Sequence, residues 1–334
     1  MHSRLFRVAV VIVGLSAAAA GCGKYSISNI RSLKAFQDAN KHYLRGEYKQ
    51  AIERYEDSVR FNPELGFAYF FLGNSYDQMY KPSRKGEAEN DAYLPKAVEY
   101  YRIAIDKMKS ATDPKELEIR KRAYEYLVDA YSPQKMNDFS KAEPVMQELI
   151  ALEPNDPANH QALGRLYEDQ GMYEEAEAEF KKAIDVNPSD ALGYQYLASY
   201  YNRQGEFDKT MEAFQQRANV EPNNPEAWHT MSTFYSDKVI RDKGLARAKQ
   251  LEYVEAGLAA EDKALAINAE YHDALVYKNI LLRQKALLVR SPAEQKALIE
   301  EADALQARAE EIRKKQNEAG GGGDAKAGGS GGGN

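Results

Sequence analysis

The sequence is poor in the residues that a covalent framework or a nucleic-acid interface would need. Its 334 residues include one cysteine, one tryptophan and five histidines. A single cysteine excludes a disulfide bond within the chain. The 45 basic residues are fewer than the 51 acidic ones, which gives a net charge of −6. Binding to nucleic acid relies on a basic excess, so this composition argues against a nucleic-acid partner.

Motifs for catalysis or metal binding are missing as well. The sequence contains no HExxH motif, no Walker loop and no GxSxG motif. No two histidines have the spacing of a helical metal pair; they are His2, His42, His160, His229 and His272. Adjacent acidic residues such as Glu174 and Glu175 are typical of solvated helix faces. We therefore expect no enzymatic activity, no bound metal and no cofactor.

The first residues have the pattern of a targeting signal. Two arginines precede an apolar stretch over residues 8–20, which is too short to span a bilayer. Three small residues then lead into Cys22, and this arrangement resembles the signal peptide of bacterial lipoproteins. The resemblance implies that residues 1–21 are removed and that Cys22 carries acyl chains such as palmitate. An ordinary cleaved signal peptide with an incidental cysteine is the alternative.

Lipidation at Cys22 would place the protein in the cell envelope. More than one acyl chain gives stable anchoring to a membrane. By resemblance to enterobacterial lipoproteins, Gly23 after the cysteine permits transfer to the outer membrane. We expect a lipid-anchored protein that faces the periplasm.

The rest of the chain repeats itself with a period of 34 residues. Gly164, Ala198 and Ser232 are one period apart. The same spacing separates Leu163, Leu197 and Met231; Tyr167, Tyr201 and Tyr235; and Pro154, Pro188 and Pro222. Apolar residues at intervals of three and four between residues 32 and 316 indicate helices. A period of this length is typical of stacked helical hairpins.

The repeated unit resembles the tetratricopeptide repeat. That repeat has an aromatic-x₂-Leu-Gly-x₂-Tyr helix, an Ala-x₃-Phe helix and a closing proline. One copy here runs through His160, Leu163, Gly164, Tyr167, Ala176, Phe180 and Pro188. The resemblance implies an all-α, right-handed α-solenoid of about seven hairpins. Such an array offers a long surface for holding another molecule and seldom a deep catalytic pocket.

These observations divide the chain into four parts. They are a signal peptide (1–21), a lipidated N-terminus and tether (22–31), the repeat array (32–316) and a disordered glycine-rich tail (317–334). Two insertions interrupt the array. Residues 81–92 are polar and are expected to form a loop, whereas residues near 237–256 are expected to lengthen two helices.

The first helix of each hairpin is expected to line the inner, concave face, as in similar arrays. Residues one, five and eight positions after the first signature residue fall on one helical stripe. With two residues one turn earlier, the predicted partner-binding groove contains Leu33, Phe36, Asn40, Tyr43, Phe67, Phe70, Asn74, Gln161, Arg165, Gln195, Asn202 and His229. Exposed phenylalanines would mark an interface. Alternatively, residues 81–92 or 23–31 cover Phe67 and Phe70.

Two asparagines in this groove resemble the carboxylate clamp of chaperone-binding tetratricopeptide domains. They are Asn40 and Asn74, but Phe36 and Phe70 stand where such a clamp places lysine. This departure argues against recognition of a free C-terminal carboxylate. An asparagine side chain can still form hydrogen bonds with an extended peptide backbone.

The sequence therefore favours a non-catalytic scaffold that holds a partner protein or peptide in its groove. The scaffold would be attached to the membrane through its N-terminal lipid and take part in an envelope, secretion or pilus complex. The alternative is a binding module for a glycan or a peptidoglycan fragment in polysaccharide export. That alternative depends on the tyrosines and neutral amides of the stripe between residues 160 and 236.

Overall fold

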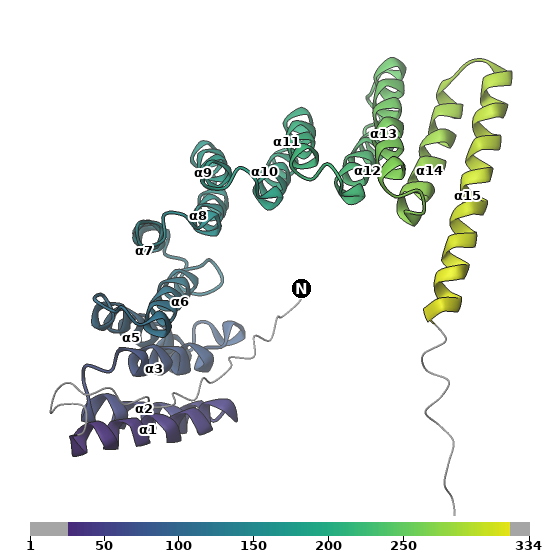
Figure 1. Ribbon diagram of the computed structural model, residues 1–334. Helices are drawn as coiled ribbons and strands as arrows, with labels where there is room; N and C mark the ends of the chain where they lie inside the picture. Colours follow the sequence, from purple (N-terminus) through teal and green to yellow (C-terminus); the bar gives the residue numbers. More distant parts are fainter. Residues whose placement is uncertain (1–25, 321–334) are drawn as a thin grey trace, which may run out of the picture. The chain divides into compact units, whose positions relative to one another are not determined.

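The computed structural model describes residues 26–320, so Cys22 and the glycine-rich end lie outside the described residues (Figure 1). The chain divides into two compact units, with the division between Met172 and Tyr173. All regular secondary structure between residues 26 and 320 is helical, and neighbouring helices are packed as repeated hairpins. The predicted fold class, an all-α solenoid of helical hairpins, is confirmed.

Unit 1 contains three complete hairpins and one further helix. The hairpins pair α1 (Ile27–Leu44) with α2 (Tyr48–Phe61), α3 (Gly66–Met79) with α5 (Tyr93–Lys107), and α6 (Pro114–Ala130) with α7 (Phe139–Leu152). The 3₁₀ helix η1 (Pro82–Arg84) and the short α4 (Ala88–Asp91) lie in the insertion between α3 and α5. Helix α8 (Pro157–Asp169) follows and packs on α7.

Unit 2 begins with one helix and continues with three hairpins. Helix α9 (Tyr173–Val186) packs on α10. The hairpins pair α10 (Ala191–Arg203) with α11 (Phe207–Val220), α12 (Pro225–Arg241) with α13 (Arg247–Ile267), and α14 (His272–Leu288) with α15 (Pro292–Gly320). No helix among the described residues combines the length and the apolar character that crossing a bilayer requires.

The boundaries of the helices follow from local sequence. Asp113 precedes α6, and its carboxylate accepts a hydrogen bond of 2.8 Å from the backbone N–H of Lys115. Pro114 then occupies the first helical position, where the missing N–H costs nothing. Between α1 and α2, Gly46 has a φ of +74°, which only glycine adopts without strain. A capping residue thus defines where α6 begins, and a turn glycine allows the chain to reverse between α1 and α2.

Small residues allow the helices of each hairpin to approach closely. At Gly73 a Cβ atom would lie 3.0 Å from the Tyr101 ring and 3.1 Å from the carbonyl oxygen of Ala97. Between α1 and α2, the hydroxyls of Ser32 and Ser58 each donate to the other residue's carbonyl oxygen, at 2.8 Å and 3.0 Å. A larger side chain at any of these positions would push the two helices apart.

Several boundaries differ from those expected from the sequence. Helix α1 begins at Ile27, so residues 27–31 are helical, whereas the sequence pattern predicts a tether there. The Ser26 hydroxyl caps this helix by accepting a hydrogen bond from the Asn29 N–H at 3.1 Å. Helix α15 continues to Gly320, beyond the expected end of the array at residue 316. The expectation for residues near 237–256 agrees with the structure, because α12 and α13 have 17 and 21 residues, whereas α10 and α11 have 13 and 14.

Candidate partner-binding face

Two pairs of successive first helices are in contact, one pair in each unit. In unit 1, α3 contacts α6, and in unit 2, α12 contacts α14. The predicted groove residues are carried by these first helices. Their burial and their contacts therefore show which of them are available to a partner.

In unit 1, an aromatic cluster occupies the space between α1, α2 and α3. The Phe36 ring lies 4.9 Å from the Phe67 ring, 5.7 Å from the Phe71 ring and 5.6 Å from the Tyr55 ring, measured between centroids. Phe36, Phe67 and the neighbouring Leu33 are half-buried. Such edge-to-face pairs add to the stability gained from burying the rings. These residues pack successive helices against each other, and only their outer edges remain open.

Phe70 belongs to the core of unit 1 and not to an open surface. Its side chain is 5% exposed. Its ring packs against Phe71, Tyr101 and Tyr126, at 5.2, 6.0 and 5.7 Å between centroids. The prediction that Phe70 lines an open groove is therefore wrong. The covering rings come from α3, α5 and α6.

The two asparagines of the predicted groove form hydrogen bonds with tyrosine hydroxyls inside the unit. The Tyr55 hydroxyl donates to Asn40 Oδ1 at 2.6 Å. Asn74 is 2% exposed; its Oδ1 accepts from the Tyr43 hydroxyl, and its Nδ2 donates to the Tyr101 hydroxyl at 3.4 Å. Burial raises the pKa of Tyr43 well above its usual range, so this hydroxyl keeps its proton. Asn74 is not available to a partner, because buried tyrosine hydroxyls require its amide.

A buried ion pair follows Asn74 on the same helix. Asp77 on α3 is 6% exposed, and its carboxylate lies 2.6 Å from Lys135 Nζ in the turn between α6 and α7. Lys135 Nζ also lies 2.6 Å from the carboxylate of Asp129. Burial raises the pKa of Asp77, while Lys135 opposes that shift. Sequence reasoning missed Lys135 because it lies outside the repeat signature and far from Asp77 in the chain.

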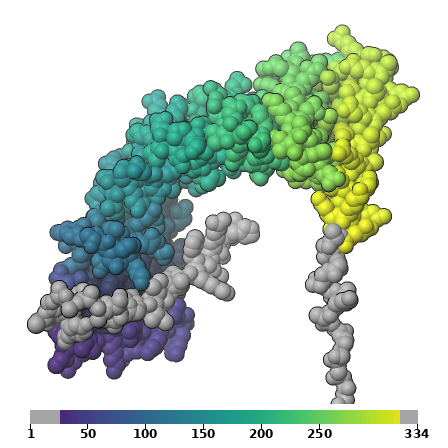
Figure 2. All heavy atoms as spheres, in the orientation of Figure 1, coloured from purple at the N-terminus to yellow at the C-terminus, as the bar shows by residue number. Residues whose placement is uncertain are grey.

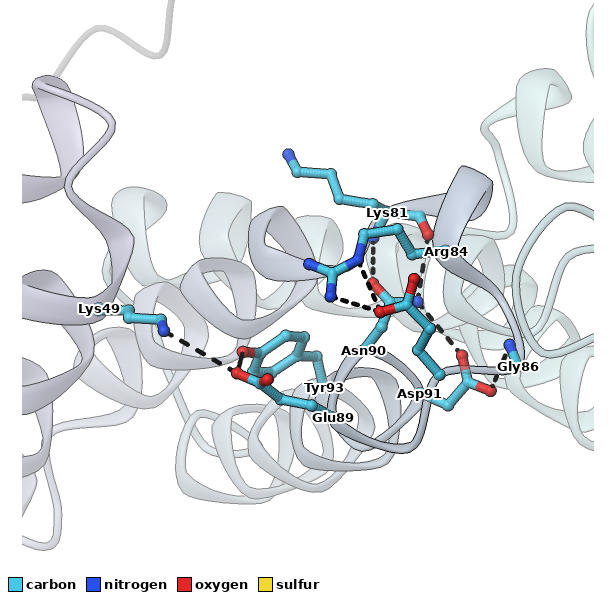
Figure 3. A network of polar contacts seen from close by, with 9 residues as sticks. Lys49, Lys81, Arg84, Gly86, Glu89, Asn90, Asp91 and Tyr93 are labelled. Carbon is cyan, nitrogen blue, oxygen red and sulfur yellow. Dashed lines mark hydrogen bonds and ion pairs between the residues drawn. The ribbon is translucent and has the colours of Figure 1, made fainter.

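The insertion at residues 81–92 is closed by its own polar contacts (Figure 3). Asn90 is 1% exposed; it accepts from the Lys81 N–H at 2.8 Å and donates to the Lys81 carbonyl oxygen at 3.1 Å. Glu89 lies 3.9 Å from Lys49 on α2. Lys85 Nζ donates to the carbonyl oxygen of Lys135 at 3.1 Å. The insertion thus supports the turn that carries the buried ion pair.

The two groove residues predicted on α8 differ from each other. Gln161 is 8% exposed and is largely buried within the described structure. Arg165, one turn later, is exposed. Of these two residues, Arg165 alone presents its side chain at the surface.

In unit 2, helix α10 presents an open stripe along one face. The stripe consists of Leu192, Gln195, Ser199 and Asn202, whose spacings of three, four and three place them on the same side of the helix. Leu192 is 53% exposed, Gln195 and Asn202 are exposed, and Ser199 is half-buried. Neither the Gln195 nor the Asn202 amide forms a hydrogen bond with another residue of the described chain. We call these four residues the α10 stripe.

His229, on the next first helix, pairs with a carboxylate of α13. Its Nδ1 lies 2.8 Å from Glu261 Oε1, and Glu261 is fully buried. The imidazole also meets the rings of Tyr271 and Tyr277 edge-on, at 5.5 and 5.0 Å between centroids. Burial raises the pKa of Glu261, and the hydrogen bond with His229 opposes that shift. His229 therefore connects α12 with α13 and α14, and only a small part of its side chain is open.

Three of the tyrosines on which the glycan alternative depends are buried, whereas Tyr173 is 50% exposed. Tyr167, Tyr200 and Tyr201 are 8%, 3% and 6% exposed. The Tyr200 hydroxyl donates to the carbonyl oxygen of Tyr173 at 2.8 Å, and the Tyr201 hydroxyl donates to Glu177 at 2.9 Å. The rings of Tyr167, Tyr200 and Tyr201 pack inside the protein, so they are not accessible to a sugar. Nowhere in residues 26–318 do three or more potential metal ligands come together.

Comparison with known proteins supports the hairpin architecture. Residues 135–200 match a tetratricopeptide repeat family model. Among solved structures, the C-terminal part of a TPR repeat-containing protein from Cytophaga hutchinsonii is 15% identical, with a TM-score of 0.50. The match covers 83% of this chain and 98% of that one. No curated protein sequence matches the chain.

Two further structures are similar at lower TM-scores. A tetratricopeptide repeat protein from Parabacteroides merdae is 15% identical, and the match covers 82% of this chain and 99% of that one, with a TM-score of 0.40. YrrB, described as a TPR protein with an unusual peptide-binding site, is 16% identical, with coverage of 60% and 91% and a TM-score of 0.36. The likeness to the Cytophaga structure extends the repeat fold across most of the chain.

Proposed function

We propose that this chain is a non-catalytic interaction scaffold that binds an extended segment of a partner protein along the α10 stripe. We further propose that a lipid on Cys22 anchors the scaffold to an envelope membrane, where it faces the periplasm. The exposed, unpaired amides of Gln195 and Asn202 carry this proposal. They contrast with Asn74, whose amide forms hydrogen bonds with two tyrosine hydroxyls inside unit 1.

The chemistry of the α10 stripe suits a peptide backbone. Each amide side chain offers one acceptor and one donor group, the same combination that a peptide group offers in return. The stripe extends over eleven residues of helix, a rise of about 15 Å, which corresponds to about four residues of extended peptide. Leu192 adds an exposed apolar contact at one end. The stripe carries no charge, so the partner segment need not be acidic or basic.

Photo-crosslinking from chosen positions in native membranes tests the binding face. A photo-reactive residue placed at position 195 or 202 should crosslink to the same envelope protein. Positions 216 and 223 serve as matched controls, because Gln216 and Asn223 are exposed amides on α11 and in the turn that follows it. Equal crosslinking of that protein from positions 195, 202, 216 and 223 would contradict the assignment of the face.

Metabolic labelling tests the anchor separately. The chain has a single cysteine, so a label introduced by a palmitate analogue should be lost completely in Cys22→Ala. A serine substitution at an exposed position, Asn223→Ser, is a control that should keep the label. Labelling that persists in Cys22→Ala would show that the acyl group is attached elsewhere.

A further inference from the structure

The outer face of α1 combines cations with exposed isoleucines. Residues Ile27, Arg31, Lys34, Asp38, Lys41 and Arg45 recur at spacings of four and three, so they lie on one side of the helix. Arg31, Lys34, Lys41 and Arg45 are exposed. Ile27 is 71% exposed and Ile30, beside the stripe, is 57% exposed. We call this surface the α1 face.

Of the four cations on the α1 face, Lys41 alone forms an ion pair with another described residue, while Lys34 interacts with Asp38 at longer range. Lys41 pairs with Asp38 at 2.8 Å. Arg31, Lys34 and Arg45 form no ion pair or side-chain hydrogen bond with any other described residue. They border a cleft of about 570 Å³ between α1 and α2, together with Asp38, Asp57 and Arg54, whose guanidinium lies 3.2 Å from Asp57. This concentration of positive charge is unusual in a chain whose net charge is −6.

The position of α1 in the chain points to what this face meets. Helix α1 is the first described helix of unit 1 and packs on α2 (Figure 1); its atoms lie at the purple end of the described chain (Figure 2). Only three residues separate Cys22 from Ser26, so the reach of the chain keeps the two within about 15 Å. A lipid on Cys22 would therefore hold the beginning of α1 at the membrane surface.

We propose that the α1 face lies on the membrane and binds anionic lipid headgroups. This inference rests on the proposed anchor at Cys22. The arginines and lysines would contact headgroup phosphates, while Ile27 and Ile30 would enter the boundary with the acyl chains. The helix spans about 27 Å between Ile27 and Arg45, so several headgroups can be contacted at once. The lipid would supply attachment, and the α1 face would set the orientation of unit 1.

Lysine labelling on vesicles tests the proposal with the full chain. The chain is reconstituted into vesicles of phosphatidylcholine alone or with about a third phosphatidylglycerol, and is exposed to a membrane-impermeant amine-reactive reagent. Labelling of Lys34, read by mass spectrometry, should fall about fivefold on the anionic vesicles, since each contact is worth about 1 kcal/mol. High salt should restore labelling. Lys243 and Lys314, exposed residues of unit 2, are internal controls whose labelling should not change.

Charge reversal provides the matched variants. Arg31→Glu with Arg45→Glu should abolish the protection of Lys34, whereas Lys243→Glu with Lys314→Glu should preserve it. All four substituted residues are exposed, so circular dichroism should show the same helix content in both variants. Equal labelling of Lys34 on both kinds of vesicle would overturn the proposal.

Two further outcomes separate this inference from its premise. Mass spectrometry of the N-terminal peptide from the same preparation shows whether Cys22 is acylated. If Cys22 is acylated but the labelling of Lys34 does not depend on the lipid, the proposal for the α1 face is wrong and the proposal for the anchor stands. A chain that lacks the acyl group and binds neither kind of vesicle overturns both. Protection that depends on protein concentration without vesicles would assign the face to a second copy of the chain instead.

Discussion

The two units use the same helical position for different purposes. In unit 1, the first helices α1 and α3 direct aromatic and amide side chains into the core, where Asn74 bonds with two tyrosine hydroxyls. In unit 2, the first helix α10 leaves Gln195 and Asn202 exposed. The repeat signature is common to both, so it determines the position of a helix but not whether its adjacent stripe is open.

The aromatic content of neighbouring helices explains this difference. Around Phe70, the rings of Phe71, Tyr101 and Tyr126 come from three helices and close over the stripe. Along α10, the signature residue Tyr201 donates to Glu177 on the preceding helix, away from the α10 stripe. In unit 1 the stripe on α3 is thus part of the core, whereas in unit 2 the stripe on α10 is exposed.

The largest expected effect comes from truncating the core of unit 1. Phe70→Ala should lower the free energy of unfolding by about 4 kcal/mol, because it leaves a cavity among packed rings. Leu192→Ala on the α10 stripe should change it by less than about 0.5 kcal/mol. Urea unfolding followed by circular dichroism measures both. Similar losses of unfolding free energy in the two variants would contradict the distinction between a buried stripe in unit 1 and an exposed stripe in unit 2.

The buried ion pair of unit 1 should also be sensitive. Lys135→Met leaves the carboxylate of Asp77 buried without its cation, at a cost of about 3 kcal/mol. Adding Asp77→Asn should recover part of this loss, because the uncompensated charge is then removed. Hydrogen exchange of α3 and of the turn after α6 measures where the loss occurs. A double variant that is no more stable than Lys135→Met would rule out the ion pair as the cause.

In unit 2, the corresponding buried contact is the pair of His229 and Glu261. His229→Leu should cost about 2 kcal/mol at pH 7, because the buried carboxylate loses its hydrogen-bond donor. The pKa of Glu261 is already raised by burial, and losing His229 raises it further. The folded state then keeps the carboxyl proton to a higher pH than the unfolded state does, so stability rises as pH falls. The difference in free energy of unfolding between the wild-type protein and the variant should therefore become smaller from pH 7 to pH 5. A difference that does not change with pH would contradict this prediction.

Much of the fold could be predicted from the sequence. The period of 34 residues identified the hairpins, because a packing unit that stacks on its own copy must repeat its core residues at the same spacing. Two local features also agree with the sequence pattern: Gly73 leaves room for the Tyr101 ring, and Asp113 caps α6. The start of α1 was placed several residues too late because the signature begins inside that helix.

The candidate site was less predictable because exposure depends on residues distant in sequence. By their spacing, Phe70 and Asn74 occupy stripe positions. However, the Tyr126 ring from a later helix packs on Phe70, and the Tyr101 hydroxyl accepts a hydrogen bond from the Asn74 amide. His229 is similar, since Glu261 lies 32 residues away on α13. Gln195 and Asn202 remain open, and no local signal in the sequence distinguishes them from Asn74.

A comparison of two asparagines, the buried Asn74 and the exposed Asn202, tests most directly the claim that this helical position belongs to the core in unit 1 and to the binding face in unit 2. Asn74→Ala and Asn202→Ala are compared for the free energy of unfolding and for crosslinking of the partner from position 195. Asn74→Ala should lose about 2 kcal/mol, because it leaves buried hydroxyls unpaired, and should retain crosslinking. Asn202→Ala should keep its stability and lose most of the crosslinking. The reverse result, with Asn202→Ala destabilised and Asn74→Ala deficient in crosslinking, would contradict the assignment of core and binding face.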